Sequence, residues 1–169
     1  MADTPLAAEA IKKGLKEAGI HFVVALPDRV TSHFLLKSLL ADPEFRVVQV
    51  CKEDEGVSIC TGLYAAGQKS VLIIQYTGLL DSINALRGIG IEGRSPVCMM
   101  VGLLGKEPDV PPSQSQKYGV KIIEPILDAM GIGHHLIERD EDTARIAPVI
   151  AKAYAESFPA AILIGREPR

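Results

Sequence analysis

Six short apolar runs alternate along the chain with stretches in which apolar residues recur at helical spacing. The runs are rich in Val, Ile and Leu and nearly continuous, which is typical of strands covered on both faces of a parallel sheet. They are His21–Leu26, Arg46–Cys51, Ser70–Gln75, Pro96–Val101, His134–Glu138 and Ala160–Ile164. The helical patterns are Pro5–Ala18, Arg29–Leu40, Asp54–Ala66, Gly78–Gly90, Ile122–Met130 and Asp140–Glu156. This alternation predicts a doubly wound α/β fold, with a mostly parallel six-stranded sheet and helices on both faces.

The length and composition of the chain are those of one globular domain. The chain has 169 residues, of which 47% are hydrophobic and 23% charged. That length suffices for one core without disulfides, so we expect residues 1–169 to form a single domain. Thr4 is the predicted N-cap of the first helix, with Pro5 at its first position and Gly19 after its end.

Charge and cysteine usage exclude several classes of function. The net charge is −3 and no basic run occurs, which argues against nucleic-acid binding. The chain has neither the start of a signal peptide nor an apolar run of membrane-spanning length, so we expect no membrane association. Cys51, Cys60 and Cys98 match no metal-binding spacing and lie in apolar stretches. They predict buried thiols in a cytoplasmic protein and no metal site.

The candidate functional segments follow the apolar runs, because ligands of such sheets bind beyond the carboxyl ends of the strands. The first three segments are Leu26–Arg29, Lys52–Gly56 and Gln75–Gly78. The fourth is Gly102–Gly119, a loop of a length that is common in lids and binding loops.

Each short segment has a structural and a functional interpretation. The acidic cluster 53–55 suits a helix N-terminus, but three consecutive acids cannot all cap one helix. One of them is therefore expected to point elsewhere, as a partly buried carboxylate that can hold a proton. Thr77 is either an N-cap or part of a ligand site at a helix start. Asp28 is either a turn residue or a site residue at the mouth of the sheet.

Other patterns argue against further sites. His134 and His135 precede or begin a strand, at the edge of the sheet opposite to the ligand crevice, so we interpret them as structural. The sequence contains no phosphate-binding loop of either common type, no HExxH and no GxSxG. A nucleotide-binding or flavodoxin-like function is therefore disfavoured.

Ordered motifs across residues 20–133 resemble a known family. They read LPDRVTSHFL, VCKEDEGVSICTGLYAAGQK, LIIQYTGLLDSINAL, SPVCMMVG and SQSQKYGVKIIEPILDAMGI. They are similar to the pyrimidine-binding, N-terminal domain of thiamin-diphosphate enzymes. Within that family they resemble most the alpha subunit of sulfopyruvate decarboxylase and the N-terminal half of phosphonopyruvate decarboxylase.

The resemblance implies a catalytic glutamate that hydrogen-bonds the ring nitrogen of the cofactor's aminopyrimidine. Glu53 lies nine positions before Gly62, which is the family spacing, and is the predicted catalytic residue. Alignment on Tyr64 points instead to Asp54, and Glu55 is a further alternative. The other residues predicted to line the cofactor or substrate are Pro27, Asp28, Gln75, Thr77 and Gly78, together with Glu53 itself.

The resemblance also implies a cofactor, a partner and a substrate class. The cofactor is thiamin diphosphate, with Mg²⁺ held by a diphosphate-binding beta subunit that carries Gly-Asp-Gly and Asn-Asn. Neither motif occurs here, so we expect a hetero-oligomer in which this chain is the alpha subunit. The substrate is a small 2-oxo acid, and decarboxylation uses the cofactor as electron acceptor.

The identity of the 2-oxo acid stays open at this point. An anionic substrate would need cationic contacts, for which the candidates are Arg29, Arg87, Lys106 and Lys117. Tyr76, Thr77, Leu80 and Asp81 depart from the family motif beside the expected cofactor site. Of these, Tyr76 and Leu80 replace polar or small family residues, which would suit a bulkier or less anionic substrate. The alternative function is a non-catalytic or regulatory pyrimidine-domain partner.

Overall fold

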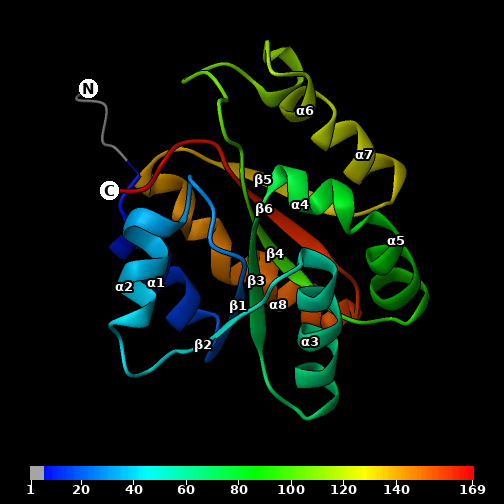
Figure 1. The fold of residues 1–169 in the computed structure, drawn as a ribbon. Helices are drawn as coiled ribbons and strands as arrows, with labels where there is room; N and C mark the ends of the chain where they lie inside the picture. Colours follow the sequence, from blue (N-terminus) through cyan, green and yellow to red (C-terminus); the bar gives the residue numbers. More distant parts are fainter. Residues whose placement is uncertain (1–5) are drawn as a thin grey trace.

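A computed structural model describes residues 6–169 as one six-stranded, entirely parallel sheet with helices on both faces (Figure 1). The strands are β1 (Phe22–Ala25), β2 (Arg46–Gln49), β3 (Ser70–Gln75), β4 (Cys98–Gly102), β5 (Gly133–Ile137) and β6 (Ala160–Ile164). Their order across the sheet is β2-β1-β3-β4-β6-β5. Every neighbouring pair is parallel, which confirms the predicted doubly wound fold.

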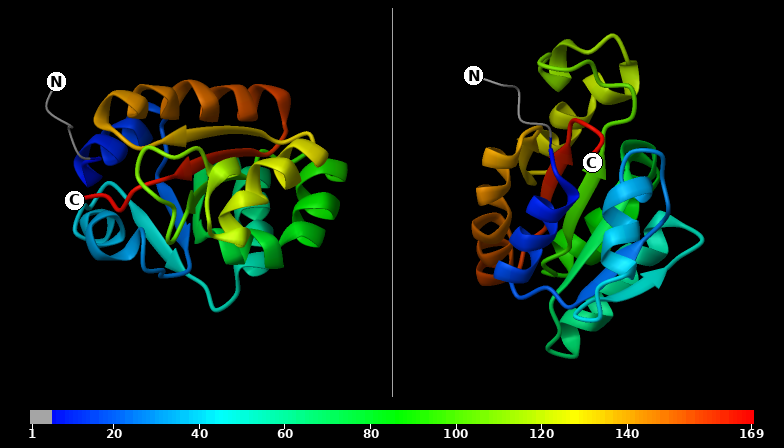
Figure 2. Two further views of the ribbon diagram at one scale, coloured as in Figure 1. Left: turned by 90° about the horizontal axis from the view of Figure 1, so that it is seen from above. Right: turned by 90° about the vertical axis from the view of Figure 1, so that its left-hand side faces the viewer.

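The helices divide into two layers, one on each side of the sheet (Figure 2). One layer contains α1 (Ala8–Glu17), the π-helix η1 (Ser32–Leu36), α2 (Lys37–Leu40) and α8 (Ile146–Glu156). The other contains α3 (Glu53–Ala65), α4 (Tyr76–Asp81), α5 (Ile83–Ala85), the π-helix η2 (Leu86–Glu92), α6 (Tyr118–Lys121) and α7 (Ile123–Ala129). Two 3₁₀ helices, η3 (Pro112–Gln114) and η4 (Asp140–Arg145), complete the chain.

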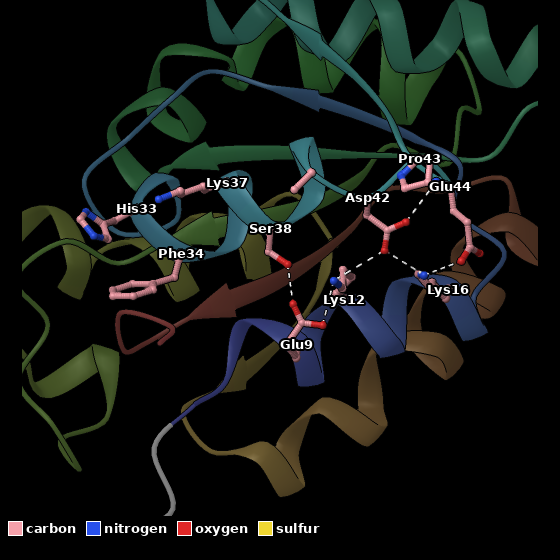
Figure 3. Close-up of a pocket in the computed structure, with 11 residues that line it drawn as sticks. Glu9, Lys12, Lys16, His33, Phe34, Lys37, Ser38, Asp42, Pro43 and Glu44 are labelled. Carbon is pink, nitrogen blue, oxygen red and sulfur yellow. Dashed lines mark hydrogen bonds and ion pairs between the residues drawn. The ribbon is translucent and has the colours of Figure 1, made fainter.

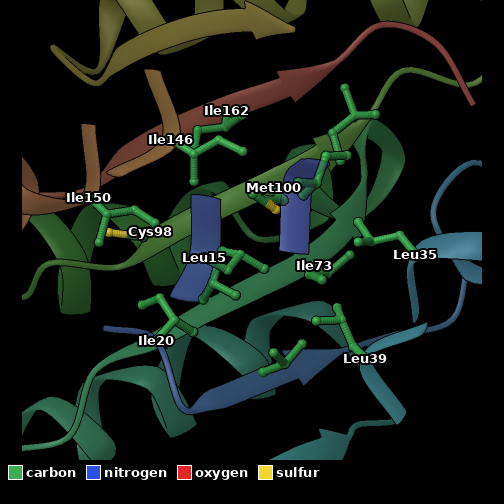
Figure 4. Close-up of a cluster of buried hydrophobic side chains, with 14 of the residues drawn as sticks. Leu15, Ile20, Leu35, Leu39, Ile73, Cys98, Met100, Ile146, Ile150 and Ile162 are labelled. Atoms are coloured by element: carbon green, nitrogen blue, oxygen red, sulfur yellow. The ribbon is translucent and has the colours of Figure 1, made fainter. Parts of the chain in front are cut away.

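Two buried clusters hold these layers to the sheet. Successive residues of a strand point to opposite faces, so Val71 and Ile73 enter the first cluster while Leu72 and Ile74 enter the second. Figure 4 shows the first cluster, to which Leu15 of α1 and the strand residue Ile73 both belong. Because both faces are covered, every residue of β4 and β6 is buried, which explains the continuous apolar runs.

The boundaries of several elements differ from those predicted. Helix α1 begins at Ala8, later than expected, and Thr4 and Pro5 lie outside the described residues. Gly19 follows α1 with φ +72°, as expected for a helix stop. The helix predicted over 78–90 begins earlier, at Tyr76, is interrupted at Ser82 and continues as a π-helix. Strand β2 ends at Gln49, before the predicted Cys51, and α3 begins at Glu53, one residue before the predicted Asp54.

The three cysteines occupy different environments. Cys60 and Cys98 are buried, and burial raises the pKa of the first to about 11 and of the second to about 12. Cys51 is exposed, so the prediction that all three are buried is wrong for this residue. It follows the end of β2, where the chain has already left the covered part of the sheet. Within residues 6–169, no helix combines the length and the hydropathy that crossing a bilayer would require.

Helix α3 approaches the sheet closely through Gly56. A Cβ at this position would overlap the Cδ1 of Leu72, a buried residue of β3. We expect Gly56→Ala to lower the free energy of unfolding by about 1–3 kcal/mol, because the core must shift to admit the methyl group. Gly62 lies in the same helix with nothing near its Cβ position. Gly62→Ala should therefore raise the free energy of unfolding by about 0.5–1 kcal/mol. Urea denaturation of both variants measures the difference, and equal effects would contradict the packing described.

Thiol reactivity tests the cysteine environments. A thiolate is the reactive form, so the raised pKa values of Cys60 and Cys98 and their burial should make both unreactive at pH 8. We expect a chromogenic disulfide reagent to modify Cys51 rapidly in the native protein and the other two only after denaturation. Cys51→Ser is the control and should abolish the fast phase. A second fast thiol in the native protein would contradict the structure.

Candidate functional site

A pocket of about 470 Å³ lies at the carboxyl ends of β1, β2 and β3. From β1 the chain passes to β2 on one side, and then to β3 on the other side of β1. This reversal opens a crevice at the carboxyl edge, which is where ligands of doubly wound sheets bind. The pocket is lined by Leu26, Pro27, Asp28, Arg29, Ser32, Glu53, Gln75 and Thr77. Every predicted site residue except Gly78 is thus part of its wall, and Gly78 contacts Glu53.

The side chain of Glu53 lies directly against Gly78. A Cβ on Gly78 would overlap Cγ, Cδ and Oε1 of Glu53, so only glycine leaves room for the carboxylate there. Glu53 is half-buried, and no residue within 6–169 donates a hydrogen bond to its carboxylate or forms an ion pair with it. The carboxylate is therefore available to accept a hydrogen bond from a ligand.

The two neighbouring acids are occupied at the start of α3. Glu55 Oε2 accepts hydrogen bonds from the backbone N–H groups of Cys51 and Lys52, at 3.2 and 3.3 Å. Asp54 Oδ1 accepts the N–H of Glu55 at 3.0 Å, and its Oδ2 lies 3.7 Å from the Nζ of Lys52. Glu55 is the acid of a capping box, and Glu53 is the acid of the three that lines the pocket.

Asp28 holds together the turn that follows β1. Its Oδ1 accepts the N–H groups of Val30 and Thr31, at 2.5 and 2.9 Å, and its Oδ2 accepts the Thr31 hydroxyl at 2.5 Å. The N–H of Asp28 donates to the Ser32 hydroxyl at 2.6 Å. The turn interpretation of Asp28 is therefore correct, and its proposed contact with a ligand stays a prediction.

In the segment after β3, Thr77 lines the pocket, although one interpretation of the sequence made it a helix N-cap. Helix α4 begins at Tyr76, and no side-chain hydrogen bond caps it, so Thr77 is not an N-cap. The Thr77 hydroxyl donates instead to Gln75 Oε1 at 3.1 Å. Both of these side chains line the pocket and can present hydroxyl and amide groups to a ligand.

The two apolar departures from the family motif pack away from the pocket. Tyr76 and Leu80 join the second buried cluster, and neither lines the pocket. The ring of Tyr76 lies against Gly119 of α6, where a Cβ would overlap it. These departures were expected beside the cofactor site, and the structure corrects that expectation, because they face the core and the helix that follows the long loop.

The loop Gly102–Gly119 is tied to its surroundings along its length. The buried Nζ of Lys106 pairs with Glu138 Oε1 at 2.5 Å, and Asp109 pairs with Arg139 at 2.9 Å. Glu107 Oε2 accepts the Ser115 hydroxyl at 2.7 Å, and this hydrogen bond is the main cause that lowers the pKa of Glu107. The loop therefore forms an anchored surface beside β4, β5 and β6.

The histidine pair lies on β5, at the far edge of the sheet from the pocket. His134 Nε2 lies 3.0 Å from Asp128 Oδ1. Burial lowers the pKa of His135, with the positive charge of Arg145 as the next cause. Within the described residues no group of His, Cys, Asp and Glu could hold a metal ion. The position of the pair on β5 and the contact of His134 with Asp128 agree with the structural interpretation.

A larger hollow of about 700 Å³ lies between α1 and α2, and most of its charged side chains pair with one another (Figure 3). Lys12 pairs with Glu9 at 2.8 Å, and Lys16 pairs with Asp42 at 2.9 Å and Glu44 at 2.6 Å. Such mutual pairing is typical of a solvated helix surface. The pocket that contains Glu53 is taken as the candidate functional site because it lies at the carboxyl ends of the strands and holds the predicted residues.

Sequence reasoning did not single out Ser32 as a pocket residue. Ser32 reaches the wall because the turn at Asp28 brings its hydroxyl back to the Asp28 N–H. A serine four residues after an Asp in a Pro-Asp turn is the signal that could have suggested this position.

Comparisons with known proteins agree with the motifs. A sulfopyruvate decarboxylase subunit alpha from Methanothermobacter thermautotrophicus is 34% identical over 100 residues, 59% of this chain and 60% of that protein. Its namesake from Methanocaldococcus jannaschii is 26% identical over 155 residues, 91% of this chain and 90% of its own length. A Methanosarcina acetivorans protein named sulfopyruvate decarboxylase is 28% identical over 164 residues, 92% of this chain but 39% of its own length.

No family model matches the chain. The chain spans about 60% of the length of the Methanothermobacter relative, less than two thirds of it. The pairwise matches are nevertheless all named sulfopyruvate decarboxylase or its subunit alpha. The chain is therefore similar in sequence to sulfopyruvate decarboxylases and their alpha subunits, which confirms the resemblance predicted from its motifs.

Proposed function

We propose that this chain is the pyrimidine-binding alpha subunit of a two-subunit, thiamin-diphosphate-dependent 2-oxo-acid decarboxylase of the sulfopyruvate decarboxylase type. The observation that carries the proposal is the Glu53 carboxylate, which has no partner among residues 6–169 and lines a pocket at the switch point of the sheet. The names of the similar proteins support the same reaction class.

The residues of the pocket fit an aminopyrimidine ring. Glu53 offers a carboxylate to a protonated ring nitrogen, and Gly78 beside it leaves the approach free of side-chain atoms. Leu26 and Pro27 offer apolar surface, while Gln75 offers an amide that can bond an exocyclic amine. When bound, thiamin diphosphate supplies an electron sink for the decarboxylation of a 2-oxo acid.

The task of this chain's residues is to hold a proton and to orient the ring. Glu53 shares a proton with the ring nitrogen, and a half-buried pocket strengthens this hydrogen bond relative to water. The helix start at Lys52–Glu55 fixes the backbone of Glu53, because Glu55 binds the N–H groups of Cys51 and Lys52. A fixed carboxylate lowers the cost of organising the site during turnover.

We propose that a second subunit completes the site and holds the diphosphate and Mg²⁺ with Gly-Asp-Gly and Asn-Asn segments. Three relatives are named alpha subunits, and one of these matches this chain over nearly its whole length. The Methanosarcina protein named as the enzyme has 61% of its length outside the match, since 39% is covered. Both observations support a second polypeptide or region that works together with the region to which this chain corresponds.

We also propose that the protein resides in the cytoplasm. The three cysteines are unpaired, and a reducing compartment keeps thiols in that state.

The role of Glu53 is tested by Glu53→Gln in the assembled complex. We expect kcat to fall by about 10²–10⁴-fold, because the amide cannot take up the proton that the carboxylate holds. Asp54→Asn is the matched control, since Asp54 is the adjacent acid and lies outside the pocket, and its kcat should stay within about threefold. Unchanged turnover in the Glu53 variant would favour the alternative of a non-catalytic pyrimidine-domain partner.

The need for a second subunit is tested with the purified chain. The chain alone, given thiamin diphosphate, Mg²⁺ and sulfopyruvate, is expected to release no CO₂ above the uncatalysed rate, because no phosphate-binding motif was found in its sequence. Addition of the purified beta subunit should restore turnover. Decarboxylation by the chain alone would refute the two-subunit proposal.

A further inference from the structure

One guanidinium lies in the pocket that contains Glu53. Arg29 is exposed, lines the pocket, and forms no hydrogen bond or ion pair with any residue of the described range 6–169. Among the described residues that line the pocket, Arg29 is the only one with a cationic side chain. An arginine whose guanidinium has no partner within the protein can bind an anion through two parallel hydrogen bonds.

The other basic residues considered for an anionic substrate are placed elsewhere. Lys106 is buried in its pair with Glu138, and its Nζ also donates to the carbonyl of Glu107 at 2.9 Å. Arg87 pairs with Glu92 at 2.6 Å and donates to Asn84. The side chain of Lys117 packs over Gly105, outside the pocket. Of the four basic candidates, Arg29 is therefore the one that lines the pocket, and the sequence alone could not distinguish it from the other three.

The turn that carries Arg29 is held on both sides of it. Asp28 binds the backbone N–H groups of Val30 and Thr31, and Val30 packs against Gly102 at the end of β4. The Asp28 carboxylate is engaged by these donors and by the Thr31 hydroxyl, so no direct Asp28 pair neutralises Arg29. Ser32 accepts the Asp28 N–H through its oxygen and retains its own proton to donate to a ligand.

We propose that Arg29 is the specificity-determining residue for substrate, binding the second anionic group of a 2-oxo acid whose C3 carries a sulfonate or phosphonate. This inference rests on the proposed function. The pocket also contains the carboxylates of Glu53 and Asp28, so a doubly charged substrate needs a cation to offset their repulsion.

Arg29 serves the retained anion, and the carboxylate that leaves as CO₂ is bound elsewhere. A cation on the departing carboxylate would stabilise the ground state more than the transition state, in which that charge is lost, and would slow the reaction. A cation on the retained group binds both states alike. Loss of Arg29 should therefore raise KM and leave kcat nearly unchanged.

The test compares Arg29→Gln with the unmodified assembled complex on sulfopyruvate, phosphonopyruvate and pyruvate. We expect KM for the two dianionic substrates to rise by roughly 10- to 100-fold, as for loss of a charged hydrogen bond, with kcat within about threefold. KM for pyruvate, which has no second anion, should change by less than about threefold. Arg29→Lys should recover part of the affinity, because it keeps the charge without the planar fork.

Arg87→Gln is the matched control, because it removes another guanidinium that lies outside the pocket, and it should leave every KM unchanged. A binding measurement stands beside the kinetics. Calorimetry with 3-sulfopropanoate, a dianion without the keto group, should give a Kd that Arg29→Gln weakens by the same roughly 10- to 100-fold.

The outcomes separate this inference from the proposed function. If the unmodified complex decarboxylates none of the 2-oxo acids, the proposed function fails, while a Kd for 3-sulfopropanoate that depends on Arg29 would still support the anion contact. If Arg29→Gln changes KM for pyruvate and sulfopyruvate equally, or leaves KM and the Kd of 3-sulfopropanoate unchanged, the inference about Arg29 is overturned. A rise for one dianion only would identify which anion, sulfonate or phosphonate, the residue binds.

Discussion

The parallel pairing of β1 with both β2 and β3 decides where every polar residue of the candidate site lies. Parallel strands carry their carboxyl ends to one edge, and the chain leaves β1 first to one side and later to the other. The segments that follow these three strands therefore meet, although Asp28 and Thr77 are far apart in the sequence. Two apolar clusters, one on each face, stabilise this arrangement.

Short-range hydrogen bonds then divide the charged groups in and beside the pocket into those used by the fold and those left for a ligand. Asp28 and Glu55 satisfy backbone N–H groups that would otherwise lack partners at a turn and at a helix start. Glu53 stands beside Gly78, with no described donor. The candidate carboxylate is thus distinguished as much by what its neighbours bind as by its own position.

The same division applies to the basic residues. Lys106 is unavailable to a ligand, because its charge is buried against Glu138. Arg29 lies on a turn that is fixed through other residues, so its side chain can meet a ligand without a change in the fold. The pocket thus contains a carboxylate, from Glu53, and a guanidinium, from Arg29. The carboxylate suits the recognition of a ring nitrogen, and the guanidinium suits the recognition of an anion.

The sequence alone determined the fold class and the segments that form the site. Strands buried on both faces are nearly continuous in apolar residues, so β3 and β6 were located to the residue, and the strand ends pointed to Glu53, Gln75 and Thr77. The sequence could not separate Glu53 from Asp54 and Glu55, because the choice depends on which acid caps α3 and which one meets Gly78 across space. It likewise could not show that Cys51 is exposed or that Tyr76 faces α6. These outcomes depend on contacts between segments distant in the chain, and local pattern carries no information about such contacts, so only the tertiary structure decided them.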